Sequence, residues 1–106
     1  MDINYDMIPE HCRDGVRLYI EQGQPTGDFL RAVFSNDLVE AVARADDTNR
    51  HCLRDYALFL WNEAPHGEIR SWGSPEIYEA WIEAGGLAGL AIKRTEAEQL
   101  HTGERR

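Results

Sequence analysis

The stretch Trp72–Gly89, WGSPEIYEAWIEAGGLAG, decides the fold because it encodes a helix together with the signals that begin and end it. Ser74 has a side-chain acceptor suited to an N-cap, and Pro75 follows at the first helical position, where a missing N–H has no cost. Gly85 stands at the other end, and glycine there adopts the left-handed conformation that terminates helices. We therefore predict a helix from about Pro75 to Ala84.

This predicted helix has two faces of different chemistry. Apolar side chains recur at the spacing of a buried stripe, at Ile77, Ala80, Trp81 and Ala84. Three carboxylates share another side of the helix, because Glu76, Glu79 and Glu83 stand at i, i+3 and i+7. We call these three residues the glutamate ridge. The helix should therefore bury one face and expose a row of negative charge.

Two helices are predicted upstream of residue 36. The first runs from Pro9 to about Gln22 and ends at Gly23, and the second is short and is capped by Thr26. Inward positions follow the 3.6-residue period. They are Ile8, Cys12, Val16, Tyr19 and Ile20 in the first helix, and Phe29, Leu30, Val33 and Phe34 in the second.

Two more helices are predicted between residues 37 and 64. Asp37, with Glu40 three residues later, has the spacing of a capping box and begins a helix that reaches about Ala45. Residues 46–48 cap a longer helix, which ends before Pro65 because proline disfavours helical geometry in the residue before it. The inward positions are Leu38, Ala41, Val42 and Ala45 in the former, and Leu53, Tyr56, Ala57, Leu60 and Trp61 in the latter.

The chain is therefore predicted to be all-α, a single small domain built as an irregular bundle of about five short helices. Sustained alternation of apolar and polar residues, which would indicate strands, does not occur in the sequence. Residues 1–7 form a polar N-terminal arm, and residues 8–90 form the helical domain. Residues 91–106 form a polar C-terminal tail, helical for a turn or two from about Arg94 and then disordered.

The charge of the chain limits its partners. Its 106 residues carry a net charge of −8, and the positive side consists of ten arginines and Lys93. An acidic surface repels phosphate backbones and anionic lipid, so a basic protein surface is a more favourable partner than nucleic acid or a membrane. Two cysteines, no signal peptide and no apolar run of membrane-spanning length indicate the cytoplasm.

The sequence offers little support for catalysis, a metal or a cofactor. His-Cys occurs at residues 11–12 and 51–52, but helical zinc ligands favour i, i+3 or i, i+4 spacing, and a reactive thiolate needs an electropositive site. The glycines of residues 85–89 follow a helix C-terminus, where the dipole repels phosphate. The carboxylates lie at caps and on solvated faces, whereas a general acid needs an apolar pocket. We expect no enzyme activity, no metal and no cofactor.

Two surfaces remain as binding candidates. The first combines the glutamate ridge with Glu68 and Trp72 of the preceding loop and would contact a basic partner surface; the alternative, a merely solvated face, is commoner for a run of charge. The second is an arginine set that could contact nucleic acid, although it is better explained by ion pairs with Asp46, Asp47 and Asp55. This set consists of Arg13, Arg17, Arg44, Arg50 and Arg54. A homodimer is a further alternative.

Four segments form a pattern that extends over most of the chain. They are IPEHCRDGVRLYIEQG (Ile8–Gly23), GDFLRAVFSNDLVEAVARAD (Gly27–Asp46), FLWNEAP (Phe59–Pro65) and WGSPEIYEAWIEAGGLAG (Trp72–Gly89). From residue 8 to residue 89 they span about three-quarters of the sequence. In this pattern the chain resembles a family of short uncharacterised proteins encoded by bacteriophages and prophages.

The family brings no activity and no catalytic residues to this sequence. The resemblance implies a mobile-element protein that acts in the cytoplasm of a host bacterium. Such a protein would bind and modulate a host protein, as an inhibitor of CRISPR or of another defence system does. The arginine set keeps a nucleic-acid-binding phage regulator as the alternative.

Overall fold

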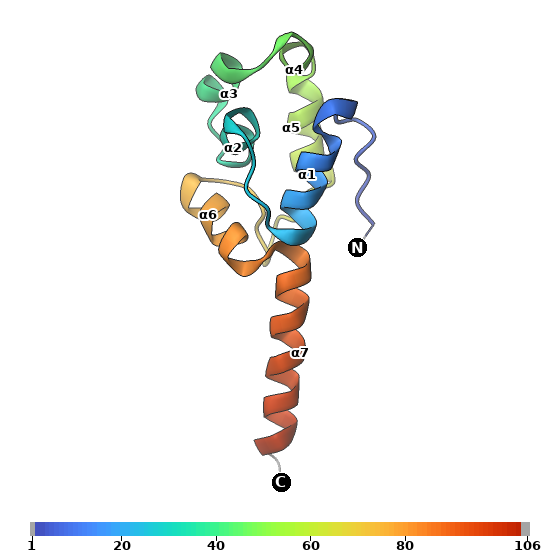
Figure 1. The fold of residues 1–106 in the computed structure, drawn as a ribbon, viewed down its shortest axis with the longest axis vertical. Helices are drawn as coiled ribbons and strands as arrows, with labels where there is room; N and C mark the ends of the chain where they lie inside the picture. The colour runs from blue at the N-terminus through green and yellow to red at the C-terminus, as the bar shows by residue number, and fades with distance from the viewer. Residues whose placement is uncertain (1, 105–106) are drawn as a thin grey trace.

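The computed structural model of the chain describes the backbone of residues 2–104 and the side chains of residues 2–97. These described residues contain helices and no strand, which confirms the predicted all-α class. The helices are α1 (Glu10–Gln22), α2 (Asp28–Phe34), α3 (Leu38–Arg44), α4 (Asp47–His51), α5 (Leu53–Asn62), α6 (Pro75–Ala84) and α7 (Gly86–Glu104). α1 to α6 pack into one body, and most of α7 projects from it, so the molecule measures 59 × 25 × 20 Å (Figure 1).

α6 has the boundaries that its local sequence predicts. Its N-cap is Ser74, whose hydroxyl accepts a hydrogen bond from the backbone N–H of Ile77 at 3.2 Å. Pro75 opens the first turn, and Gly85 ends the helix with φ 81° in the left-handed region. Local cap chemistry is therefore enough to place this helix.

The core is organised around Tyr19 of α1. The centroid of its ring lies 4.1 Å from that of Phe34 and 5.2 Å from that of Tyr78, and both pairs are stacked. The Tyr19 hydroxyl donates to the carbonyl of Ser71 at 2.8 Å, and the Tyr19 carbonyl accepts from Nε1 of Trp81 at 2.9 Å. One buried side chain therefore connects α1 with α2, α6 and the loop that precedes α6.

α1 and α7 meet at a contact that requires glycine on both sides. Gly23 ends α1 with φ 68°, and Gly86 begins α7 with φ 65°. A Cβ atom on Gly86 would lie 2.5 Å from the backbone nitrogen of Gly23 and 2.7 Å from the carbonyl oxygen of Ile20. Both distances are shorter than any real Cβ contact, so a side chain on Gly86 would push the two helices apart.

Besides Ser74, two of the predicted N-caps are confirmed and one is wrong. The carboxylates of Asp37 and Asp46 accept the backbone N–H groups of residues 40 and 49 and so cap α3 and α4. The prediction for Thr26 is wrong, because α2 begins after Gly27. The backbone N–H and the hydroxyl of Thr26 instead contact the Tyr78 hydroxyl at 2.9 and 3.0 Å. Thr26 therefore binds a side chain of α6 instead of capping α2.

The described residues form seven helices where about five were predicted. One additional helix arises because the segment predicted as a single helix over residues 48–63 breaks at Cys52, where φ is −114° and ψ is 14°. The second is α7, which continues to Glu104 through the region predicted as a fraying tail. The predicted tail therefore begins inside a helix, and its last two residues, 105–106, lie outside the described part of the chain.

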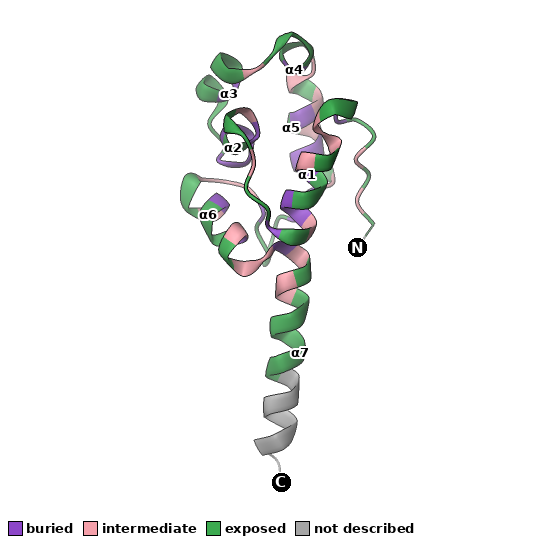
Figure 2. Ribbon diagram, in the orientation of Figure 1, coloured by how far each residue is buried: buried purple, intermediate pink, exposed green. Residues whose placement is uncertain are grey.

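Several positions predicted to face the core are exposed (Figure 2). In α3, Ala41 is buried against α2, whereas Leu38 and Val42 are 71% and 44% exposed. In α5 the buried face is centred on Phe59, which leaves Trp61 75% exposed. Ala57 in α5 and Ala80 in α6 are also exposed. Neighbouring elements cover only part of the apolar stripe on each of these short helices. The residues at the edges of the stripe are therefore exposed.

Gly86→Ala is expected to destabilise the fold by at least about 2 kcal/mol, because the new methyl group overlaps the backbone of α1 and an L-residue is strained at positive φ. Gly67→Ala is the matched control, since nothing lies within 4 Å of a Cβ atom there. It should stay within about 0.5 kcal/mol of the unmodified chain. Urea unfolding followed by circular dichroism measures both, and equal stability of the two variants would contradict the glycine constraint.

Candidate functional site

The glutamate ridge lies on the outer face of α6. Glu76, Glu79 and Glu83 are all exposed, as their spacing predicts. Their orientation is fixed from the opposite side of the helix, where Tyr78 and Trp81 are 2% and 3% exposed. Because both aromatic anchors are hydrogen-bonded, α6 cannot rotate about its axis without breaking buried contacts. The backbone positions of the three glutamates are therefore fixed in a row on the outer face of α6.

One arginine approaches this row from α2. The guanidinium of Arg31 lies 3.6 Å from a carboxylate oxygen of Glu79, and the two side chains are 57% and 61% exposed. The same guanidinium lies 5.8 Å from the centroid of the Tyr78 ring. An exposed ion pair of this kind contributes at most about 1 kcal/mol. Arg31 therefore offsets part of the ridge charge, while Glu76 and Glu83 keep theirs directed to solvent.

Glu68 and Trp72, the other two predicted contact residues, occupy different environments. Glu68 is exposed in the loop between α5 and α6, and among the described residues no hydrogen bond or ion pair joins it to the ridge. Trp72 is half-buried and packs against the core, with its ring stacked 4.5 Å from that of His66. The structure thus groups the three ridge residues on one helix and leaves these two in the preceding loop.

The tryptophan that lies in solvent is Trp61, although its helical spacing predicts a position in the core. It is 75% exposed, whereas the indole Nε1 of Trp72 is buried without a hydrogen-bond partner. A signal for this arrangement exists in the sequence, because Phe59 and Leu60 are two adjacent large apolar residues that already fill the buried sector of α5. A third large apolar residue next to them falls outside that sector.

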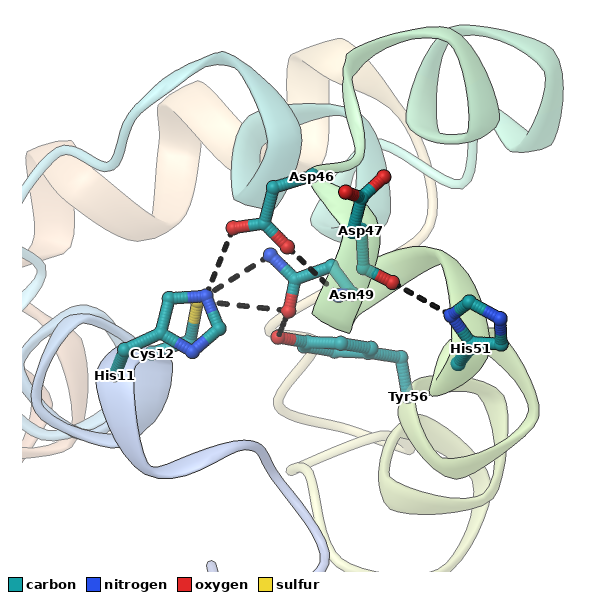
Figure 3. Close-up of polar contacts among 7 residues, drawn as sticks. All are labelled: His11, Cys12, Asp46, Asp47, Asn49, His51 and Tyr56. Carbon is teal, nitrogen blue, oxygen red and sulfur yellow. Dashed lines mark hydrogen bonds and ion pairs between the residues drawn. The ribbon is translucent and has the colours of Figure 1, made fainter.

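A polar junction ties α1 to α4 and α5 (Figure 3). Its centre is Asn49, which is 3% exposed and accepts a hydrogen bond from the Tyr56 hydroxyl at 2.7 Å. The amide Nδ2 of Asn49 lies 3.5 Å from the sulfur of Cys12. Its backbone N–H donates to Asp46, whose other carboxylate oxygen lies 2.9 Å from Nε2 of His11. These five residues form what we call the Asn49 junction.

The protonation states in the Asn49 junction favour the hydrogen bonds that hold α1 against α4 and α5. The backbone N–H of Asn49, and then the His11 side chain, lower the pKa of Asp46 below its ordinary value. Burial raises the pKa of the Tyr56 phenol, which therefore stays protonated and donates to the Asn49 amide. Cys12 contacts the amide and His11 contacts the carboxylate, so the adjacent thiol and imidazole do not form a nucleophile–base pair.

The second His-Cys pair faces elsewhere. His51 donates from Nδ1 to the backbone carbonyl of Asp47 at 2.7 Å, within its own helix (Figure 3). Cys52 is half-buried at the break between α4 and α5. In the part of the chain that the structure describes, no group of three or more His, Cys, Asp or Glu side chains is placed to hold a metal ion.

Most of the arginines proposed for nucleic-acid contact are engaged within the chain. Arg13 donates to the backbone carbonyls of residues 6 and 8, and Arg17, Arg44 and Arg50 bind carboxylates. The ion pairs are Arg17–Asp14, Arg50–Asp47, Arg44–Glu40 and Arg44–Asp28. Arg54 is exposed on α5. Three of the five arginines therefore form ion pairs. Of the three aspartates predicted as their partners, Asp47 is confirmed, whereas Asp46 binds His11 and no ion pair of Asp55 occurs among the described residues.

Comparisons of the chain with protein-family models, with curated proteins and with solved structures found no match. None of the helices in the described part of the chain combines the length and the apolar character needed to cross a membrane.

Asp46→Asn is expected to lower stability at neutral pH and to have no effect in acid. A carboxylate whose folded-state pKa is lowered contributes stability above its unfolded pKa of about 3.9, and this contribution is lost as the pH falls through the folded-state pKa. Asparagine still caps the helix, so the substitution isolates the charge. Urea midpoints of both chains between neutral pH and about pH 2 measure the difference. A difference that stays constant with pH would contradict the lowered pKa.

Proposed function

We propose that this chain is a non-catalytic binding protein whose glutamate ridge contacts a basic surface on another protein. The observation that carries the proposal is the fixed outward row of Glu76, Glu79 and Glu83 on a helix whose other face is locked in the core. Because α6 is already fixed in the fold, a partner that docks on it does not have to order the helix backbone. The net charge of −8 adds long-range attraction for a basic partner.

The resemblance to phage-encoded proteins supports a host bacterial protein in the cytoplasm as the partner. In its finer form the proposal is that this partner belongs to a defence system, CRISPR included, and that the chain inhibits it. Support for this finer form comes from the resemblance and from the small size and net negative charge of the chain. A phage plaque assay in bacteria with an active defence system measures it, since expression of the chain should raise plaque counts and a ridge variant should not.

Binding to nucleic acid is the alternative, and the arginine contacts count against it. Cations that already bind carboxylates or backbone carbonyls must exchange those partners before they can neutralise phosphates. Duplex DNA at low ionic strength should therefore produce no salt-sensitive mobility shift with the purified chain. A shift that disappears as salt is added would favour the alternative over a protein partner.

Replacing the three ridge glutamates with lysine should reduce capture of the specific partner from bacterial lysate at least about tenfold, because like charges then face each other across the interface. Quantitative mass spectrometry of proteins retained on the immobilised chain measures this. A charge-matched control replaces three exposed carboxylates outside the ridge with lysine. These are Asp2, Glu10 and Glu96.

The control separates specific contact from net charge. Both variants change the charge of the chain equally, so any protein attracted by net charge alone is lost from both. The proposal expects a protein that the control variant retains and the ridge variant loses. Identical sets of captured proteins from the two variants would rule out the ridge as the contact surface.

A further inference from the structure

α3 exposes an apolar face that nothing in the described chain covers. Leu38, Val39 and Val42 are 71%, 80% and 44% exposed, although they lie on the same helix as the buried Ala41. In helical projection these four residues occupy one continuous sector, and Glu40 and Arg44 lie on the opposite side. Isolated exposed aliphatic residues are ordinary, but three on one short helix form a patch of the kind that marks an interaction surface.

This face borders a hollow between α2, α3 and α5. The hollow has a volume of about 100 Å³ and is mainly apolar. Its lining includes Ala32 and Val33 from α2, Leu38 from α3, and Leu53, Ala57 and Leu60 from α5. An engineered apolar cavity of about 150 Å³ holds a benzene ring, so this space suits a single aliphatic side chain. We call it the α3–α5 hollow.

The shape favours an amphipathic helix as the occupant. Residues of three helices, α2, α3 and α5, line the α3–α5 hollow. An apolar hollow between helices is a site where the apolar face of another helix can dock through anchors at i, i+3 or i+4, and i+7. One anchor would enter the hollow. Neighbouring apolar residues of the same helix would then cover Leu38, Val39 and Val42.

The charge favours a basic occupant over a second copy of the chain. Asp37 is the charged residue among those that line the hollow, and its carboxylate accepts a hydrogen bond from the backbone N–H of Glu40. The nearest cation on α3, Arg44, is bound by Glu40 and Asp28. Each copy of the chain carries a net charge of −8, so two copies repel each other while a cationic helix is attracted.

We propose that the α3–α5 hollow and the adjoining apolar face of α3 form a docking groove for a basic amphipathic helix of a partner protein. This surface is separate from the glutamate ridge on α6. It is an interaction site in its own right, whether or not the ridge also binds.

The probe is a synthetic capped helical peptide of about 15 residues, the length at which isolated helices become stable, with leucine at the anchor positions and lysine elsewhere. A second peptide carries glutamate in place of lysine. Binding to the full chain is measured by fluorescence anisotropy, and the contact surface is mapped by amide chemical shifts. The lysine peptide should bind, and the shifts should change in α2, α3 and α5.

Two uncharged variants test the groove itself. Leu38→Gln removes an exposed contact, and Ala57→Leu fills the hollow at an exposed helical position where leucine is well tolerated. Each should weaken binding of the lysine peptide about tenfold. Ile92→Gln is the matched control, because Ile92 is 61% exposed on α7, outside the groove. This control should leave the affinity unchanged, and circular dichroism checks that all three variants are folded.

Four results would contradict the proposed docking groove. They are equal binding of the glutamate peptide, equal weakening by Ile92→Gln, shift changes confined to α6, and no binding at about 1 mM peptide. Sedimentation of the unmodified chain as a dimer that Leu38→Gln dissociates would assign the face to a second copy and would also overturn it.

Discussion

The hydrogen bond from the indole of Trp81 to the carbonyl of Tyr19 is the constraint on which the rest of the arrangement depends. Both groups are buried, so separating them would leave a desolvated donor and acceptor, at a cost of about 1–3 kcal/mol for each. The bond sets the rotation of α6 against α1. That rotation carries Tyr78 inward to meet Tyr19 and Thr26, and it carries the glutamate ridge outward.

Features encoded by neighbouring residues could be predicted from the sequence. Ser74, Pro75 and Gly85 are enough to predict the bounds of α6. A cap hydroxyl, a missing N–H and a left-handed glycine each act within one helical turn. The cap at Asp37 and the αL end of α1 at Gly23 follow the same logic. The exposure of the ridge was predictable too, since helical spacing alone places its members on one face.

Features that depend on distant partners could not be predicted. The neighbours of a short helix decide which part of its apolar surface is covered. Helical spacing alone therefore predicts Leu38 and Trp61 in the core, whereas both are exposed. The Asn49 junction joins residues up to 37 positions apart, and no local spacing predicts that proximity. The break at Cys52 and the helical continuation beyond Gly86 likewise reflect packing and chain geometry rather than composition.

The projecting α7 changes how the size of this protein should be judged in solution. A compact chain of 106 residues has a radius of gyration of about 13 Å, whereas the value here is 15.5 Å. Friction rises with elongation, so a monomer of 12.1 kDa leaves a gel-filtration column earlier than globular standards of its mass. Early elution is therefore expected of a single copy, and stoichiometry has to be read from light scattering or another direct measure of molar mass.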